Sequence, residues 1–149
     1  MEQPPDLDRL IAFYHALTPE SVARFPAFYS ADAYFKDPFN EVRGVEAIAR
    51  IFAHMFRQVD APRFTVTERV AEANGAMLVW ALSYHVRRWG RSRTQVIRGI
   101  SHLKFAADGK VNYHRDYWDA AEELYMKLPV FGRIMRYLKN AFACKPLAG

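Results

Sequence analysis

The change in hydrophobic period after Pro62 constrains the fold more than any other feature of this sequence. Before it, apolar residues recur at helical spacing. After it, "RFTVTERVAE" and "AMLVWALSYHV" alternate as strands do, and Asn74-Gly75 between them favours a tight hairpin turn. Two more alternating stretches follow, "TQVIRGISHLKF" and "KVNYHRDYW". The sequence therefore predicts a meander of four antiparallel strands after a helical half.

Three helices are expected in that first half. Asp6 is a candidate N-cap of the first, Thr18 and Pro19 begin the second, and Gly44 precedes the third. Between the second and third helices, "ADAYFKDP" alternates and ends at Pro38, which is typical of a short strand. Helices segregated from a sheet indicate the α+β class, with the helices covering one face of a bent sheet.

The composition fits one ordinary domain. At 149 residues and 51% hydrophobic content, the chain has no internal repeat and no Gly/Ser linker that would divide it. Its start, "MEQPPDLDRL", lacks the basic residues and apolar core of a secretory signal, and no run of 18 apolar residues occurs. The single Cys144 cannot form an intrachain disulfide. We expect a soluble, cytoplasmic protein with one domain over residues 1–149.

The net charge of +5 raises the question of a nucleic-acid partner. The basic residues cluster in the hairpin 87–98 and in the carboxyl-terminal tail, and no nucleic-acid-binding motif accompanies either cluster. We therefore expect no nucleic-acid partner. The histidines and the cysteine show no metal-ligand spacing, so a metal site could form only if folding joined His85, His114 and a carboxylate. We expect neither a metal nor a cofactor.

The order of elements and several motifs resemble the nuclear transport factor 2-like superfamily, which includes ketosteroid isomerases, SnoaL-like polyketide cyclases and limonene-epoxide hydrolases. The resemblance covers roughly residues 6–128 and is strongest at "FYSADAYFKDP", at the helix after Gly44, at "ISHLKF" and at "HRDYWD". It implies a cone-shaped, cystatin-like fold in which helices pack on a curved, mostly antiparallel sheet and enclose a pocket. This fold hosts enzymes and binding proteins alike.

Comparison with the ketosteroid isomerases concerns three positions. Tyr14 and Asp37 match the proton-transfer pair of that family, which implies that Asp37 is a general base and Tyr14 an oxyanion donor. The protonated aspartate of that family is replaced here by Ser101. A serine hydroxyl is a weaker donor than a neutral carboxylic acid, so the resemblance argues against steroid isomerisation itself.

Comparison with the epoxide hydrolases gives a second role for the last strand. Asp116 in "HRDYWD" matches a catalytic aspartate of that family. The other four catalytic positions are occupied here by Ser83, His85, Phe35 and Asp37, so one of five residues is retained. Epoxide opening by that mechanism is therefore the less favoured activity.

These comparisons predict the pocket. Strand residues two apart share a face, so His114 and Trp118 should point inward with Asp116. The expected catalytic residues are Asp37, Tyr14, Asp116 and His114. The expected ligand-binding residues are Phe35, Ser83, His85, Ser101, Leu103, Phe105 and Trp118.

Two functions fit this set of residues. The favoured one is binding of a small lipophilic molecule with cofactor-free acid–base proton transfer, as in isomerases or cyclases. The alternative is a non-catalytic ligand-binding or dimerisation module, in which the buried Asp–His pair only orders the core.

The outer sheet face and the tail suggest partners. If Asp116 points inward, an aromatic outer face should form and pack as a homodimer. Its expected residues are Tyr113, Arg115, Tyr117, Trp80, Leu82, Tyr84 and Ile100. Residues 129–143 predict an amphipathic helix with a basic side. We expect this helix to cap the open end of the cone, with contact to an anionic membrane as the less favoured role.

Overall fold

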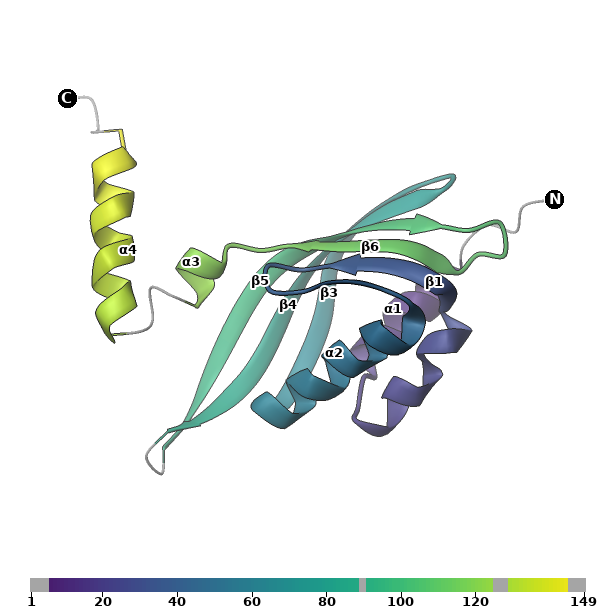
Figure 1. The fold of residues 1–149 in the computed structure, drawn as a ribbon, viewed down its shortest axis with the longest axis horizontal. Helices are drawn as coiled ribbons and strands as arrows, with labels where there is room; N and C mark the ends of the chain where they lie inside the picture. Colours follow the sequence, from purple (N-terminus) through teal and green to yellow (C-terminus); the bar gives the residue numbers. More distant parts are fainter. Residues whose placement is uncertain (1–5, 89–90, 125–128, 145–149) are drawn as a thin grey trace. The chain divides into compact units, whose positions relative to one another are not determined.

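In the described part of the chain, six strands form one curved sheet that positions the other elements (Figure 1). The structure is a computed structural model that describes residues 6–88, 91–124 and 129–144. The strand order is β2-β1-β6-β5-β4-β3. The bounds are Tyr29–Lys36 for β1, Glu41–Arg43 for β2, Asp60–Glu72 for β3, Gly75–Arg88 for β4, Arg91–Phe105 for β5 and Val111–Tyr117 for β6.

The pairing of the strands is mostly antiparallel. β1 runs parallel to β6, whereas the other neighbouring strands pair antiparallel. The α+β class with a curved, mostly antiparallel sheet is thus confirmed. The sequence did not predict β2 or the placement of β1 beside β6. A strand of three residues carries no periodic signal, and pairing between distant strands is not encoded in local periodicity.

The helices of the first half begin where the sequence predicts. In α1 (Leu7–His15), the Asp6 side chain accepts a hydrogen bond from the backbone of Arg9 at 3.0 Å. The second helix, η1 (Glu20–Ala27), is a 3₁₀ helix that contains Pro26. Gly44, with a φ of 105° that favours glycine, precedes α2 (Val45–Gln58).

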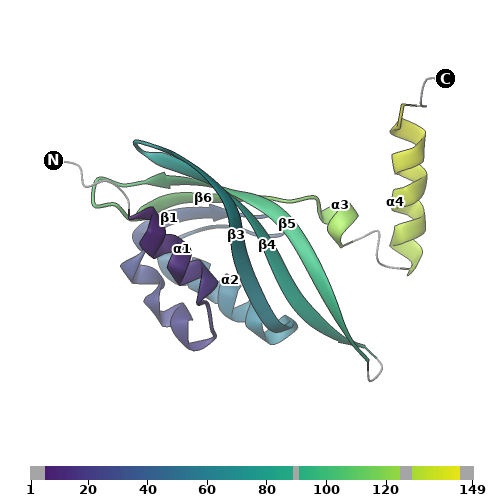
Figure 2. The same cartoon turned by 180° about the vertical axis from the view of Figure 1, so that it is seen from behind.

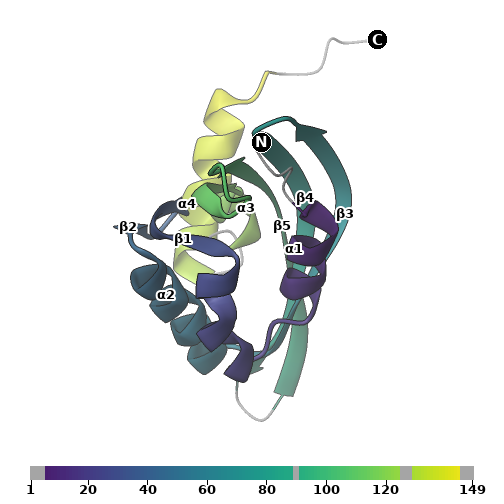
Figure 3. The same cartoon turned by 90° about the vertical axis from the view of Figure 1, so that its right-hand side faces the viewer.

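The helices cover the hollow face of the sheet. Figure 3 shows α1 beside β3 and α2 beside β1, and Figure 2 shows the same arrangement from behind. Apolar side chains from both helices meet those of the sheet in one core. The fully buried ones include Phe25, Phe35, Ile48, Leu78 and Leu103. The core therefore lies between the helices and the concave side of the sheet.

The two faces of β4 are reversed relative to the prediction. Trp80, Leu82 and Tyr84 point into the core and are only 6%, 9% and 7% exposed. The prediction that places them on the outer face, with Ser83 and His85 in the pocket, is wrong. His85 instead lies on the other face, where its Nδ1 is 3.2 Å from Thr94 Oγ1. Both faces of this strand carry apolar residues, so alternation alone could not orient it.

The chain divides into two compact units, the first ending at Trp118 and the second beginning at Asp119. The second unit contains α3 (Ala120–Glu123) and α4 (Pro129–Phe142). The large apolar residues of α4 are exposed: Val130, Phe131, Ile134, Tyr137, Leu138 and Phe142. The capping role of this helix stays a prediction. None of the described helices combines the length and the apolar character needed to cross a membrane.

The orientation of β4 can be tested with one substitution at two neighbouring positions. Leu82→Asn should lower the free energy of unfolding by about 3 kcal/mol, because a polar group replaces a buried side chain. Ser83→Asn should change it by at most about 0.5 kcal/mol. Urea unfolding followed by circular dichroism measures both, and equal losses at the two positions would show that the faces are assigned incorrectly.

Candidate functional site

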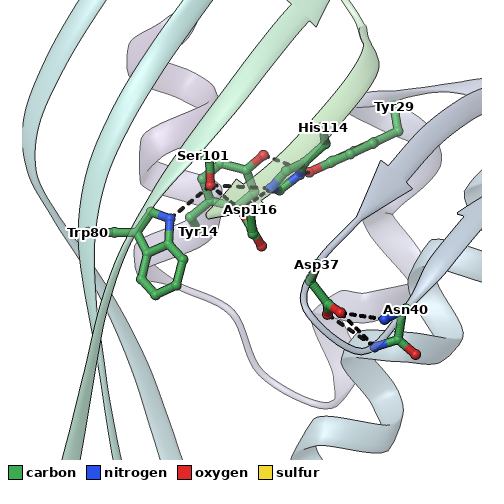
Figure 4. A network of polar contacts seen from close by, with 8 residues as sticks. All are labelled: Tyr14, Tyr29, Asp37, Asn40, Trp80, Ser101, His114 and Asp116. Carbon is green, nitrogen blue, oxygen red and sulfur yellow. Dashed lines mark hydrogen bonds and ion pairs between the residues drawn. The ribbon is translucent and has the colours of Figure 1, made fainter. Parts of the chain in front are cut away.

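Polar side chains from α1, β1 and β6 form a chain of hydrogen bonds through the core (Figure 4). The hydroxyls of Tyr14 and Tyr29 lie 2.6 Å apart, and the Tyr29 hydroxyl lies 2.7 Å from Nδ1 of His114. All three side chains are buried. Tyr14 belongs to the buried face of α1, Tyr29 begins β1, and the parallel pairing of β1 with β6 places His114 opposite Phe35.

Asp116 ends this chain and accepts two hydrogen bonds on one carboxylate oxygen. Its Oδ1 lies 2.7 Å from His114 Nε2 and 2.5 Å from Ser101 Oγ. Ser101 Oγ in turn accepts a hydrogen bond from Trp80 Nε1 at 2.8 Å. The antiparallel register pairs Ser101 on β5 with Asp116 on β6, so the backbone pairing itself brings these side chains together.

The chemistry of each group assigns a direction to the hydrogen bonds. Trp80 Nε1 can only donate, so Ser101 uses its own hydrogen for Asp116. An ionised carboxylate only accepts, so we place the ring hydrogen of His114 on Nε2. His114 Nδ1 then accepts from Tyr29, and Tyr29 accepts from Tyr14. In this arrangement every donor is used: Tyr14 donates to Tyr29, Tyr29 to His114, and His114 and Ser101 to Asp116.

The two tyrosines act as hydrogen-bond donors and not as phenolates. Burial raises the pKa of Tyr14 well above its ordinary value, and this effect exceeds the lowering by the hydrogen bond with Tyr29. Burial also raises the pKa of Tyr29, with the neighbouring Tyr14 adding to the shift. The charge of Asp116 raises both pKa values further. Both hydroxyls therefore keep their hydrogens at neutral pH.

A narrow pocket opens onto this chain of hydrogen bonds. Its lining residues are Tyr14, Phe52, Phe64, Val66, Leu78, Trp80, Ser101, His114 and Asp116. The free space is about 350 Å³ with its open mouth included, and inside there is room for only about one or two water molecules. Among these lining residues Asp116 is the only carboxylate, and its side chain is 14% exposed. No described residue donates a hydrogen bond to its Oδ2, which points away from the other polar groups (Figure 4).

The structure brings some of the predicted site residues together. Tyr14, Ser101, His114 and Asp116 all line the pocket. Leu103 and Phe35 are fully buried in the core behind it, and Phe105 packs against that core. These three support the pocket from behind.

Other predicted residues lie elsewhere. Trp118 packs edge-to-face on Phe39 at 5.5 Å and against the second cluster of buried residues, which Trp80, Leu82, Tyr84 and Ile97 form. Ser83 and His85 lie on the opposite face of β4 and do not line the pocket.

Asp37 is engaged in a turn. Its Oδ1 accepts hydrogen bonds from the backbone of Phe39 at 2.7 Å and of Asn40 at 2.6 Å. The Asn40 side-chain amide donates to both carboxylate oxygens, at 3.1 and 3.0 Å. Asp37 does not line the pocket, and Figure 4 shows it apart from the chain of hydrogen bonds. In this position its carboxylate stabilises the connection between β1 and β2.

Sequence reasoning missed Tyr29 and Trp80. Tyr29 is an amphipathic residue at the start of a strand. Nothing in the neighbouring sequence distinguishes it from an aromatic residue that only packs in the core. Trp80 would have been found if the faces of β4 had been assigned correctly, because its indole N–H needs a partner when it is buried.

The described residues contain no group of three His, Cys, Asp or Glu side chains arranged to hold a metal ion. The pair His85 and His114 suggested by the sequence is split between the two sheet faces.

The fold and the site together define an α+β domain with a single-carboxylate pocket on the hollow side of its sheet. Residues 10–114 match the family model described as SnoaL-like domain. The chain belongs to this SnoaL-like family. No curated protein matches the chain.

Solved structures with the same fold share little sequence with this chain. A protein of ketosteroid isomerase-like fold from Catenulispora acidiphila, solved with trimethylamine, has 14% identity and a TM-score of 0.65, covering 82% of this chain and 92% of its own. A protein assigned as a SnoaL-like polyketide cyclase from Shewanella putrefaciens has 18% identity and a TM-score of 0.65, covering 84% and 100%. TsrD from Streptomyces laurentii has 18% identity and a TM-score of 0.63, covering 83% and 91%. These likenesses show the nuclear transport factor 2-like fold.

The chain of hydrogen bonds can be tested by removing one hydroxyl. Tyr29→Phe deprives His114 Nδ1 of its donor and Tyr14 of its acceptor, so the free energy of unfolding should fall by about 1–3 kcal/mol. Tyr117→Phe, which changes an exposed ring, is the control. Urea unfolding at neutral pH measures both, and equal stability of Tyr29→Phe and wild type would contradict the assignment.

The raised pKa values of Tyr14 and Tyr29 also predict a loss of stability in alkali. Their folded-state pKa values lie above the unfolded value of about 10, so the stabilisation is full below about pH 10 and is lost as the pH rises through the folded values. Tyr29→Phe should lose stability less steeply above about pH 10, because one buried phenol is gone. Identical slopes in wild type and variant would show that Tyr29 does not contribute.

Proposed function

We propose that this pocket binds a small apolar carbonyl compound and moves a proton on it without a cofactor, with Asp116 as the base. The observation that carries the proposal is the arrangement of the Asp116 carboxylate. Two donors hold Oδ1, while Oδ2 is free of described partners in a pocket with apolar walls. A carboxylate held by one oxygen is oriented, and its other oxygen remains available to a ligand.

The proposed reaction is an isomerisation through an enolate. Asp116 Oδ2 removes a proton from the carbon next to the carbonyl, and the electron pair of that C–H bond moves toward the carbonyl oxygen. Tyr14 turns from Tyr29 and donates a hydrogen bond to that oxygen. When the ligand carries a C=C bond at the β,γ position, the enolate is a dienolate. Asp116 returns the proton to its γ-carbon, the C=C bond moves to the α,β position and the C=O bond re-forms. His114 and Ser101 keep the carboxylate oriented throughout.

The family supports this class of chemistry. The Shewanella protein of the same fold is assigned as a polyketide cyclase. Tyr14 keeps the donor role that the resemblance to the isomerases implies. Asp116 replaces Asp37 as the proposed base, because the four hydrogen bonds of Asp37 already hold it in a turn.

The second candidate function is non-catalytic binding of a small amine. Asp116 is the negative group among the aromatic rings of Tyr14, Phe64 and Trp80, and such walls attract organic cations. The Catenulispora protein of the same fold was solved with trimethylamine. A carboxylate with aromatic neighbours fits that ligand without any reaction.

The role of Asp116 is tested by exchange of ligand protons with deuterated water. With 2-cyclohexenone as the probe, Asp116→Asn should lower the enzyme-dependent exchange rate about a hundredfold or more, because a general base is lost. Asp37→Asn is the matched control and should leave exchange nearly unchanged, although it can weaken the turn. Proton nuclear magnetic resonance (NMR) measures the rate.

Two outcomes of this experiment would overturn the proposal. Exchange that survives Asp116→Asn but is lost in Asp37→Asn would make Asp37 the base. Absence of exchange in wild type, together with trimethylamine binding that Asp116→Asn abolishes, would establish the amine-binding function instead.

We further propose a homodimer that packs through the outer face of β5 and β6. Two features of this face support it. Ile100 and Tyr117 are 41% and 47% exposed, and the Arg115 guanidinium lies 4.6 Å from the centre of the Tyr117 ring. Trp80, Leu82 and Tyr84 are not part of this face because they point into the core. The face is therefore smaller than the sequence suggested, but it still combines apolar and cationic groups that a second copy can cover.

Tyr117→Glu should shift the protein from dimer to monomer, because it places a charge in the centre of the proposed contact. Val70→Glu, at an exposed apolar site on β3, is the control and should leave the dimer intact. Light scattering at tens of micromolar protein measures the mass. A monomeric wild type would rule the dimer out.

A further inference from the structure

Three contacts hold the indole of Trp80 in the pocket wall. Its Nε1 donates to Ser101 Oγ at 2.8 Å, and its ring packs edge-to-face on Phe64 with centroids 5.8 Å apart. The ring also packs over Gly99, which pairs with Trp80 in the ladder between β4 and β5. Trp80 therefore has little freedom to move aside when a ligand enters.

Gly99 determines how far the indole lies from the centre of the pocket. A Cβ atom at this position would be 2.5 Å from Trp80 Cζ2 and 2.6 Å from Cη2. Real Cβ contacts are not that short, so any side chain at position 99 would push the indole further into the free space. Because residue 99 is a glycine, the Trp80 ring can lie close to β5 and leave the pocket its present size. The ring itself forms the pocket wall next to β5.

The remaining space is small for a ligand pocket. The interior has room for only about one or two water molecules, and the 350 Å³ counts the open mouth as well, so a one-ring ligand would lie partly in the mouth. Phe52, Phe64 and Leu78 fill the neighbouring walls, and each belongs to the packed core or borders it. An indole in this position occupies volume that a larger ligand would need.

We propose that Trp80, seated on Gly99, limits the ligands of this pocket to molecules of about one ring and excludes fused-ring ketones. This inference rests on the proposed function in that the ligand occupies the pocket beside Asp116. It narrows the substrate class from lipophilic carbonyl compounds in general to small ones. The same indole also fixes the direction of the Ser101 hydroxyl toward Asp116, so it links ligand size to the orientation of the base.

Binding of three ketones of increasing size tests the limit. The probes are 2-cyclohexenone with one ring, 1-tetralone with two fused rings and a 3-oxo-4-ene steroid with four. Wild type should bind the one-ring ketone and bind the two larger ones at least about tenfold more weakly. Trp80→Ala should bind the larger ketones at least about tenfold more tightly than wild type does. Isothermal titration calorimetry measures the dissociation constants.

Trp80→Phe is a second, more conservative variant for the case that Trp80→Ala fails to fold. It keeps an aromatic ring in the pocket wall and removes the Nε1 donor and part of the side-chain volume. It should move the size preference in the same direction as Trp80→Ala by a smaller factor. Wild type that binds the steroid as tightly as 2-cyclohexenone would overturn the inference. So would folded Trp80 variants with an unchanged order of affinities, or with no affinity for any of the three ketones.

The experiment separates this inference from the proposed chemistry. Size-dependent binding without proton exchange would retain the role of Trp80 and reject Asp116 as a base. Proton exchange on the steroid by wild type would retain the chemistry and reject the size limit.

A second measurement tests the contact itself. Gly99→Ala should lower the urea midpoint of unfolding, and the loss should be smaller in a Trp80→Ala background, where the ring is absent. Part of the loss should persist there, because the added Cβ also comes within 3.0 Å of the Tyr117 backbone oxygen. Equal losses in both backgrounds would show that Trp80 is not seated on Gly99.

Discussion

The buried carboxylate of Asp116 is the constraint on which the rest of the site depends. An ionised group in an apolar core is costly unless it is hydrogen-bonded. His114 and Ser101 supply those hydrogen bonds, and each of them is held by a further residue, Tyr29 for His114 and Trp80 for Ser101. Each buried polar group in this chain of hydrogen bonds thus has a hydrogen-bond partner.

The topology of the sheet makes this arrangement possible. The register of β5 with β6 aligns Ser101 with Asp116, and the parallel pairing of β1 with β6 brings the start of β1, and with it Tyr29, toward His114. α1 then places Tyr14 within hydrogen-bond distance of Tyr29. The site therefore draws on elements from both ends of the first unit, and loss of any one pairing would leave buried polar groups without partners.

The sequence predicted the fold largely through its periodicity and turn residues. Asp6 and Gly44 mark helix starts that the structure reproduces, because caps are local. The hairpin is also present, but its turn is Ala73-Asn74, one residue earlier than predicted, and Gly75 already pairs with Glu72. The placement of β1 beside β6 and the orientation of β4 were beyond local reasoning, since they depend on contacts between distant segments. In β4, Trp80 packs over Gly99 of the neighbouring strand, and neither residue signals that contact by itself.

The candidate site was predicted only in part, because some of its contacts join residues that are far apart in the sequence. His114 and Asp116 share a strand, so their common face follows from a spacing of two. Ser101 came from the resemblance, and Tyr29 could not be found because its partner is 85 positions away. Asp37 matched a family position, yet its turn geometry could be seen only in the folded chain.

The position of the ring hydrogen of His114 tests the central claim most directly. Nitrogen-15 NMR of the imidazole at neutral pH distinguishes a protonated from an unprotonated ring nitrogen. The arrangement described here predicts hydrogen on Nε2, which faces Asp116, and none on Nδ1, which accepts from Tyr29. A ring that carries hydrogen on Nδ1, with or without hydrogen on Nε2, would contradict the assigned direction of the hydrogen bonds.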